Sequence, residues 1–352
     1  MSTRPWAIAL SFLSITALAV SQSTLGLIDT LVASGASKFA SSIQSDPDVL
    51  QMYLSGEFQT VFAPSDSVFD SIIQERALSP RERQQAAFQA TKGEVNLGIA
   101  SRTLPGSILE TANKSPQLDG QGQKVVVDTR PSNVTNLTKR WNPQFSLRQR
   151  QRSIDATPSL LKVTAGLGNT TNVIKGDIPF DGGIIHITDS YFTLPESLSS
   201  TSKATGQTAF SGLLSKSNMT STLDSMHSVT VFFPSNAAFS ATNTTASPPE
   251  LLSNHVVAGT VSYLPDLKDG TVLKTQRGET LAISVRGGIY YVNGARITQA
   301  NLILSNGVGH IIDKVLAPKP FTPPVPASAS AQMAKLAEVI GVASIIALLP
   351  FI

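Results

Sequence analysis

Two stretches of the chain show nearly the same pattern of apolar and polar residues: TVFAPSDSVF at 60–69 and TVFFPSNAAF at 230–239. In each, Thr-Val-Phe predicts a half-buried strand, and the proline ends strand pairing because it has no N–H to donate. The serine and the Asp or Asn that follow predict a helix start, because their side chains accept hydrogen bonds from free backbone N–H groups. The two phenylalanines of each stretch are expected to fill one core from strand and helix: Phe62 with Phe69, and Phe232 with Phe239.

The hydrophobic period changes along the second half of the chain. Residues 213–226 and 247–257 carry apolar residues at helical spacing, and the latter has a proline at its second position, which is typical of a helix start. Residues 271–318 instead form short apolar runs separated by Gly-Gly and Asn-Gly pairs, which predicts successive strands joined by tight turns. Helices followed by a β-meander predict the α+β class.

Comparison of the chain with itself recovers three blocks in the same order. The first is the pair of stretches described above. The second aligns SRTLPGSIL at 101–109 with NHVVAGTVS at 254–262, which places Arg102 opposite His255. The third aligns GGIIHITD at 182–189 with NGVGHIID at 306–313, each with a histidine and an aspartate three residues apart. Ordered blocks of this kind predict tandem homologous domains.

The trio TVFFPSNAAF, LLSNHVVAG and NGVGHIIDKVLAP resembles the two signature regions of the fasciclin domain and the histidine-containing segment between them. The second copy, residues 198–318, matches throughout, and the first, residues 23–197, matches firmly at its outer blocks. The resemblance implies two tandem fasciclin domains, each a wedge of β-strands wrapped by helices. It also implies a surface protein that mediates adhesion and is not an enzyme, similar to fungal or plant members of the family.

The resemblance also places the histidine segments near the edge that contacts ligands. This implies a possible ligand surface made of His186, Asp189, His255, His310 and Asp313.

The first copy departs from the pattern in two ways. Arg102 replaces the central histidine, and an insertion occupies about residues 128–160. Its basic segment at 138–153 is typical of a solvated loop. A patch for acidic polysaccharide or phospholipid, or a processing site at Lys139 and Arg140, are the alternatives.

Composition narrows the functional classes. Charged residues make up 14% of the 352 residues and the formal net charge is +3, so no extended basic surface for nucleic acid is implied. The absence of cysteine excludes disulfides, thiol catalysis and thiolate metal sites. The length is sufficient for two domains with full hydrophobic cores.

The N-terminus is expected to direct export. Residues 1–19 contain Arg4, an apolar run that begins at Trp6, and the small-residue pattern Ala17-Leu18-Ala19, which together predict a signal peptide. A buried N-terminal helix is the alternative.

The C-terminus is expected to carry a lipid anchor. Residues 319–331 are rich in Pro, Ala and Ser and predict an extended stalk, and residues 332–352 end in an apolar tail. This order predicts replacement of the tail by a glycosylphosphatidylinositol anchor, with Ser328 as the attachment residue. A tail-anchored or short spanning segment is the alternative.

Six asparagines lie in N-x-S/T sequons, which agrees with export and predicts surface glycans. They are Asn113, Asn133, Asn136, Asn169, Asn218 and Asn243.

Sequence motifs do not favour catalysis. The chain has four histidines but no His-Glu-x-x-His pair, Gly-x-Ser-x-Gly elbow or phosphate-binding glycine loop. His186, His255 and His310 lie in apolar segments, where hydrogen-bonded core positions are expected. Asp189 or Asp313 is expected to bond to backbone and hold a strand end. Histidine and aspartate three apart on a strand point to opposite faces, which argues against a metal site.

The sequence therefore predicts a non-catalytic protein without cofactor or metal that acts in cell-surface or cell-wall adhesion. Its expected partners are surface or wall glycans or proteins, and the membrane through the lipid anchor. A vacuolar or endomembrane protein of membrane fusion or trafficking is the alternative, followed by a cell-wall hydrolase. The tripeptides 175–177 and 277–279, which resemble integrin-binding motifs, are interpreted as turns.

Overall fold

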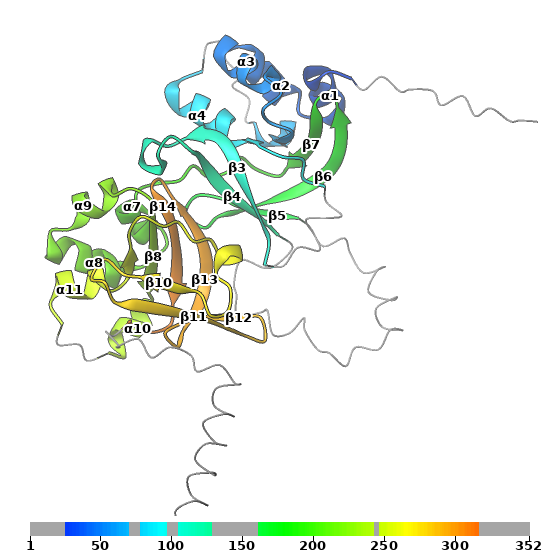
Figure 1. The fold of residues 1–352 in the computed structure, drawn as a ribbon. Coiled ribbons are helices and arrows are strands. Elements are labelled where there is room, and N and C mark those ends of the chain that lie inside the picture. The colour runs from blue at the N-terminus through cyan, green and yellow to red at the C-terminus, as the bar shows by residue number, and fades with distance from the viewer. Residues whose placement is uncertain (1–24, 70–77, 97–104, 129–160, 243–245, 317–352) are drawn as a thin grey trace, which may run out of the picture.

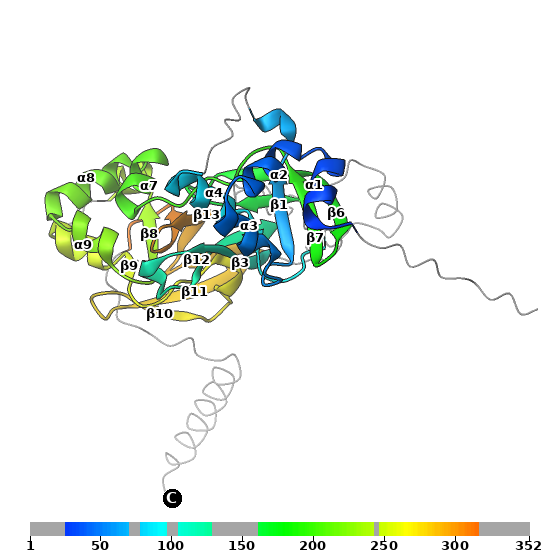
Figure 2. The ribbon, with the colours of Figure 1, turned by 90° about the horizontal axis from the view of Figure 1, so that it is seen from above.

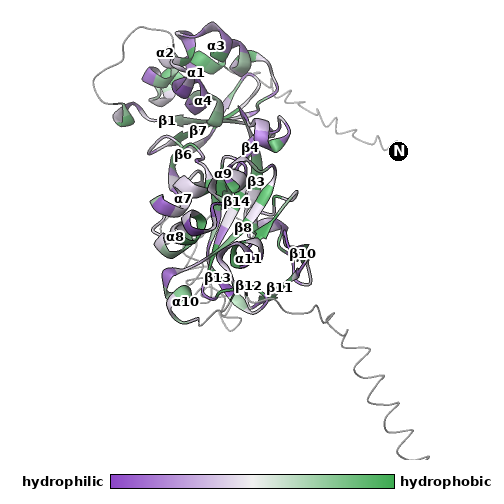
Figure 3. Ribbon diagram, turned by 90° about the vertical axis from the view of Figure 1, so that its left-hand side faces the viewer, coloured by the Kyte–Doolittle hydropathy of each residue, from purple (hydrophilic) through white to green (hydrophobic). Residues whose placement is uncertain are grey.

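The computed structural model describes residues 25–69, 78–96, 105–128, 161–242 and 246–316. These residues form two modules, each with helices concentrated in its first part and a seven-stranded sheet. Figures 1 and 3 show the first module stacked above the second. The predicted α+β class and the tandem arrangement are confirmed, whereas the residue boundaries of the two domains stay predictions.

The first module contains four α-helices, two short 3₁₀ helices and seven strands within the described ranges. They are α1 (Leu27–Ser34), α2 (Ser37–Gln44), α3 (Pro47–Leu54), β1 (Thr60–Pro64), η1 (Asp66–Val68), α4 (Pro80–Phe88), β2 (Ala90–Thr91), β3 (Ser107–Lys114), η2 (Pro116–Leu118), β4 (Gly122–Asp128), β5 (Lys162–Thr164), β6 (Thr170–Phe180) and β7 (Gly183–Thr188).

The second module repeats this order, with α7, α8 and α9 gathered on one side of the pair (Figure 2). Its elements are α7 (Leu198–Ala204), α8 (Thr208–Ser217), α9 (Thr220–Ser225), β8 (Val229–Pro234), α10 (Asn236–Ser240), α11 (Pro248–Ser253), β9 (Val256–Val257), η4 (Leu264–Asp266), β10 (Val272–Lys274), β11 (Thr280–Arg286), β12 (Ile289–Val292), β13 (Ala295–Leu304) and β14 (Gly307–Ile312).

In each module the first strand pairs in parallel with the last. β1 lies between β2 and β7, and β8 lies between β9 and β14, so the seven strands of one module correspond in order to the seven of the other. The first sheet closes into a barrel. In the second, β9 and β10 end the sheet, and the N–H of Gln276, just after β10, donates to the Val256 carbonyl at 2.7 Å.

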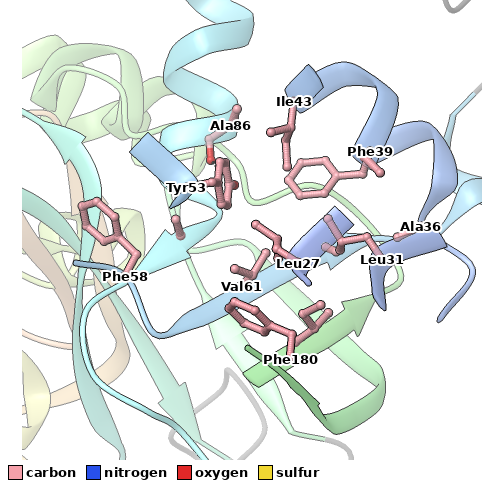
Figure 4. Close-up of a cluster of buried hydrophobic side chains, with 14 of the residues drawn as sticks. Leu27, Leu31, Ala36, Phe39, Ile43, Tyr53, Phe58, Val61, Ala86 and Phe180 are labelled. Atoms are coloured by element: carbon pink, nitrogen blue, oxygen red, sulfur yellow. Dashed lines mark hydrogen bonds between the residues drawn. The ribbon is translucent and has the colours of Figure 1, made fainter. Parts of the chain in front are cut away.

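Strands β1 and β8 are buried along their whole length, so the prediction of half-buried strands is wrong. Helices cover one face of each strand, and the other face points into the barrel. Val61 of β1 packs with Phe39 and Ile43 from the helices (Figure 4). Its neighbour Phe62 packs instead with Phe88 inside the barrel. The spacing of apolar residues in the sequence could not show that both faces of the strand are covered.

The predicted phenylalanine pairs do not share a core. Phe62 lies in the barrel cluster of the first module, whereas Phe69 packs against the helical cluster. Phe232 and Phe239 are separated in the same way in the second module. Successive strand residues point to opposite faces of the sheet. In β1, Val61 faces the helices, so its neighbour Phe62 points into the barrel, away from Phe69.

The polar residues after the prolines cap helices, but in part different helices from those expected. Ser235 Oγ accepts from the Ala238 N–H and caps α10 as predicted. Ser65 accepts no backbone N–H in this way, because only a 3₁₀ turn follows it. Asp66 accepts instead from the Lys38 N–H (2.8 Å) at the start of α2.

Asn236 is the counterpart of Asp66 in the second module. Its Oδ1 accepts from the Ala209 N–H at the start of α8 (2.9 Å), and its Nδ2 donates to the Gly206 carbonyl (2.9 Å). This residue therefore ties the turn after the first strand to the preceding helical layer.

The two modules contact each other through β4 and the segment before β4 in the first and through β13 and β14 in the second. Val126, Tyr263, Ile303 and Val308 form one buried apolar cluster across the contact. Next to it, the Ser305 carbonyl accepts hydrogen bonds from two side chains of the first module, Ser115 Oγ (2.8 Å) and Gln123 Nε2 (3.3 Å). Apolar burial and directed hydrogen bonds thus define one arrangement of the pair.

The predicted insertion lies at the tip of one hairpin. β4 ends at Asp128 and β5 begins at Lys162, whereas the equivalent strands β11 and β12 are joined only by Gly287-Gly288. Residues 129–160 themselves lie outside the described part of the chain. Among the described residues, no helix has both the length and the apolar content needed to cross a bilayer.

We expect Asn236→Ala to lower the free energy of unfolding by about 1–2 kcal/mol, because the start of α8 loses its cap. Asn236→Asp, which copies Asp66, retains the acceptor and is expected to lose less. Urea denaturation of both variants checks this order. A loss in Asn236→Asp that equals the loss in Asn236→Ala would show that the cap of α8 is not the stabilising contact.

Candidate functional site

The three histidines that the sequence placed on a possible ligand surface are buried. His186, His255 and His310 each have an exposed fraction of 0%. They lie where β7, β14 and the start of β9 meet the central strand of their module. The predicted ligand surface is therefore wrong for the histidines, whereas the expectation of hydrogen-bonded core histidines is confirmed.

His186 and His310 occupy equivalent positions and make equivalent hydrogen bonds. His186 Nε2 donates to the Val95 carbonyl (2.6 Å), and His310 Nε2 donates to the Ser262 carbonyl (2.9 Å). The Nδ1 atom of His186 accepts from the Asp177 N–H at 3.2 Å. Because one ring nitrogen donates and the other accepts, the neutral ring satisfies the site.

The rings also pack on the central strands. The His186 ring lies 5.2 Å from that of Phe62, centroid to centroid, and the His310 ring stacks on Phe232 at 5.6 Å. These contacts place both histidines inside the barrel, not in an open site.

His255 connects the end of the second module with helix α11. Its Nδ1 donates to the Leu251 carbonyl (2.7 Å), and its Nε2 accepts from the N–H of Leu316 (2.9 Å), four residues after the end of β14. The neutral ring thus connects the end of helix α11 with the segment that follows the last strand.

The counterpart of His255 in the first module is Gln89, so the sequence alignment with Arg102 is wrong. The carbonyls of Gln89 and His255 accept from the N–H groups of Phe62 and Phe232, respectively, each at 2.9 Å. Gln89 Oε1 accepts from the N–H of Phe192, four residues after β7, as His255 accepts from Leu316 after β14.

A local signal could have found this correspondence. Helix α4 begins with a capping box formed by Ser79 and Glu82, and helix α11 begins with the same box formed by Ser247 and Glu250. Alignment of these helix starts, in place of apolar spacing, brings Gln89 close to His255. Arg102 lies outside the described residues.

Burial controls the charge state of these rings. Loss of water lowers the pKa of His255 and of His310 from 6.5 to about 4 in each case, and burial lowers that of His186 as well. All three histidines are therefore neutral at pH 7 in the folded protein.

The two aspartates of the predicted surface are exposed and hold backbone, as expected. Asp189 Oδ1 accepts from the Asn172 N–H (2.9 Å), and Asp313 Oδ1 accepts from the Arg296 N–H (2.8 Å). Each therefore fastens the end of the last strand to the strand beside it.

The remaining histidine, His227, is exposed and lies in the contact between the modules. Its Nδ1 lies 3.4 Å from Asp119 Oδ1. In the described ranges, no group of three or more His, Asp or Glu residues is arranged to hold a metal ion.

The two tripeptides that resemble integrin-binding motifs differ in structure. Arg277 to Glu279 forms the expected turn between β10 and β11, and the Arg277 guanidinium pairs with Glu250 at 3.1 Å. Lys175 to Asp177 lies inside β6 at a register shift, so its interpretation as a turn is wrong.

Several predicted sites lie outside the described residues. They are the lipid-anchor residue Ser328, the processing residues Lys139 and Arg140, and the sequon asparagines Asn133, Asn136 and Asn243.

The sequons within the described residues differ in accessibility. Asn169 and Asn218 are exposed. Asn113 is half-buried, and its Nδ2 donates to Oε1 of the buried Gln123 (2.8 Å) beside the contact between the modules. The structure thus favours glycans at Asn169 and Asn218 and argues against one at Asn113.

Comparisons with known proteins agree with the fold. The sequence model of the fasciclin domain family matches residues 205–318, within the second module. A fasciclin-like arabinogalactan protein of Cercospora beticola is 32% identical over 252 residues, covering 66% of this chain and 66% of that protein. A fasciclin-like arabinogalactan protein of Arthroderma benhamiae is 35% identical over 169 residues, covering 46% of this chain and 40% of that protein.

The chain belongs to the fasciclin-domain family. The matches span 66% and 40% of the lengths of the two fungal relatives, so the roles of those whole proteins are not assigned to this chain. A solved structure of a FAS1 domain pair from the insect cell adhesion molecule fasciclin I covers 81% of this chain and 98% of its own, at 15% identity and a TM-score of 0.36.

We expect His255→Gln, which copies Gln89, to reduce the acid sensitivity of the protein. A histidine with a lowered folded pKa contributes stability above pH 6.5, and that stability is lost as the pH falls toward 4, because the unfolded chain binds the proton first. For His255 the shift in pKa corresponds to roughly 3 kcal/mol. Urea denaturation at pH 7.5 and at pH 4.5 should show a smaller difference for His255→Gln than for the parent.

Gln89→His is the reciprocal variant and is expected to increase the acid sensitivity. An unchanged pH dependence in both variants would contradict the assignment of neutral, buried rings to this position.

We further expect Asn113 to carry no glycan while Asn169 and Asn218 carry them. Peptide mass spectrometry after enzymatic deglycosylation in heavy-oxygen water measures the occupancy of each sequon, and the two exposed asparagines serve as internal controls. Full occupancy at Asn113 would be incompatible with the contact between the modules.

Proposed function

We propose that this protein is an exported cell-surface or cell-wall adhesion protein that acts by binding, not by catalysis. The observation that carries the proposal is the match of the second module to the fasciclin domain family, together with its likeness to fungal fasciclin-like arabinogalactan proteins.

The hydrogen bonding of the histidines supports binding through outer surfaces. His186, His255 and His310 hold backbone segments together in neutral form, so their ring nitrogens are engaged in the scaffold. General acid–base catalysis needs a group with a suitable pKa within reach of a substrate, whereas these rings are buried, and burial lowers the pKa of each. Contacts with partners would then come from the exposed faces of the two modules.

Two modules on one chain allow the protein to attach through several weak contacts with a partner. Each additional module raises the effective concentration of the next binding event, so modest affinities are sufficient for attachment. We propose that the N-terminal residues 1–19 are removed on export and that a lipid anchor at Ser328 retains the protein at the outer face of the membrane, raised on the stalk of residues 319–331. Both segments lie outside the described residues, and the proposal rests on their sequence patterns.

Treatment of intact cells with phosphatidylinositol-specific phospholipase C should release the protein into the medium. Ser328, Ala329 and Ser330 together changed to Leu are expected to abolish release, because no small residue remains at the attachment site. Retention of the parent after treatment, with residues 332–352 still detected by mass spectrometry, would contradict the anchor.

Deletion of the gene should reduce attachment of cells to one another or to a surface. Re-expression of the parent chain should restore attachment. Normal attachment combined with a defect in vacuolar fusion would favour the endomembrane alternative, and turnover of wall polysaccharide by the purified protein would favour a hydrolase.

A further inference from the structure

The outer face of the second sheet carries a row of residues that neighbouring strands place side by side. Ser284 of β11 stands opposite Tyr291 of β12, and Tyr291 stands opposite Arg296 of β13. Side chains directly opposite on adjacent strands point to the same face and lie within contact range. The alternate residues of the same strands, such as Ile283 and Val292, are buried in the barrel cluster, so the row faces outward.

Cations flank the aromatic ring in this row. The Arg286 guanidinium lies over the Tyr291 ring, 5.9 Å from its centroid, and Arg296 is the cross-strand neighbour of the same tyrosine. Arg286 is exposed, and Tyr291 and Arg296 are partly exposed. We call Arg286, Tyr291 and Arg296 the arginine–tyrosine row.

Within the described part of the chain, neither Arg286 nor Arg296 forms an ion pair, so the positive charge of each guanidinium group is not neutralised there. Two acidic side chains of neighbouring segments bind backbone N–H groups. Asp313 accepts from the Arg296 N–H, and Asp269 accepts from the Val285 N–H, both at 2.8 Å. Lys314, next to Asp313, is exposed and adds another positive charge.

The Arg296 Nε is buried and has no hydrogen-bond acceptor within the described residues. A ligand cannot reach a buried atom, so a carboxylate would be held by the two terminal nitrogens of the guanidinium group. A guanidinium group binds carboxylates through two parallel hydrogen bonds, and such charge-assisted bonds are stronger than neutral ones.

The first module places different chemistry at the same positions. Asp128 stands opposite Lys162, and Lys162 stands opposite Asn172, so its row pairs an anion with a cation. Asp189 accepts from both the N–H and the side-chain amide of Asn172, at 2.9 and 2.5 Å. The equivalent Asp313 accepts only the N–H of Arg296 in the described structure. The two outer faces have thus diverged, whereas the inner hydrogen bonds have not.

We propose that the arginine–tyrosine row binds acidic polysaccharide, with uronate carboxylates held by Arg296 and Arg286 and a sugar ring packed on the face of Tyr291 that Arg286 does not cover. A carboxylate suits the fork of a guanidinium group, and the aromatic ring offers an apolar face with a polar rim to the CH groups of a pyranose. The proposal deepens the adhesion function and rests on it, because the row would supply the surface by which the protein attaches to a wall or matrix.

The binding test uses the full secreted chain and polygalacturonate as the probe. Its fully methyl-esterified form serves as a matched polymer without charge. We expect binding to polygalacturonate that weakens with increasing salt and little binding to the ester. Arg296→Asn, which copies the first module, and Tyr291→Ala should each weaken binding about tenfold, corresponding to about 1.4 kcal/mol.

Matched variants separate the row from general charge. Lys274→Gln removes one exposed positive charge from the same module outside the row, and Tyr291→Phe keeps the ring, so both should bind within about twofold of the parent. Circular dichroism and the thermal midpoint verify that each variant is folded. Equal binding of the ester and the acid, an unchanged affinity in folded Arg296→Asn, or an equal loss in Lys274→Gln would each overturn the proposal.

Vesicles with anionic phospholipid serve as the competing acidic surface. Binding to vesicles that depends on Arg296, without binding to polygalacturonate, would also overturn the proposal.

Cell attachment distinguishes this proposal from the adhesion function. If deletion of the gene abolishes attachment but Arg296→Asn leaves polygalacturonate binding intact, the adhesion function stands and the site fails. If the site binds and deletion leaves attachment unchanged, the site stands and the adhesion function fails.

Discussion

The parallel pairing of the first strand with the last is the contact on which each module depends. β8 and β14 pair along their whole length although Val229 and Ile312 lie far apart in sequence, so the chain between them must close a long loop before this pair forms. Both strands are fully buried, and helices and barrel cluster pack on their two sides. The cost of loop closure is offset by apolar burial on both faces, which explains why the paired segments carry the recognisable sequence blocks.

Neutral hydrogen-bonding groups complete this pairing. Backbone groups of the connecting segments and of the register shifts in β6 and β13 lack strand partners, and buried backbone groups need partners. His186 and His310 satisfy two such groups each. At the third position Gln89 and His255 accept from the same backbone N–H in the two modules. This position requires a buried hydrogen-bond acceptor for the backbone N–H after the last strand. The amide of Gln89 and the imidazole of His255 both provide it.

Much of the fold could be predicted from the sequence, because helix starts, turns and the first and third blocks are local signals. The α+β class and the tandem modules followed from them. The counterpart of His255 could not be found by apolar spacing, since Arg102 precedes a similar apolar run, whereas Gln89 follows an equivalent capped helix. The burial of β1 and the separation of Phe62 from Phe69 depend on which elements cover each face, and no periodicity reports that.

Strand register decides where the two modules differ. Tyr291 and Arg296 are separated by a turn in the sequence, and only the pairing of β12 with β13 makes them neighbours on one face. The inner positions must satisfy the same backbone groups in both modules, so substitutions there are constrained by the cost of unpaired buried atoms. The outer positions carry no such constraint. The first module therefore has Lys162 and Asn172 at the positions that Tyr291 and Arg296 occupy in the second. The chain thus presents two chemically different outer faces on two modules of the same fold.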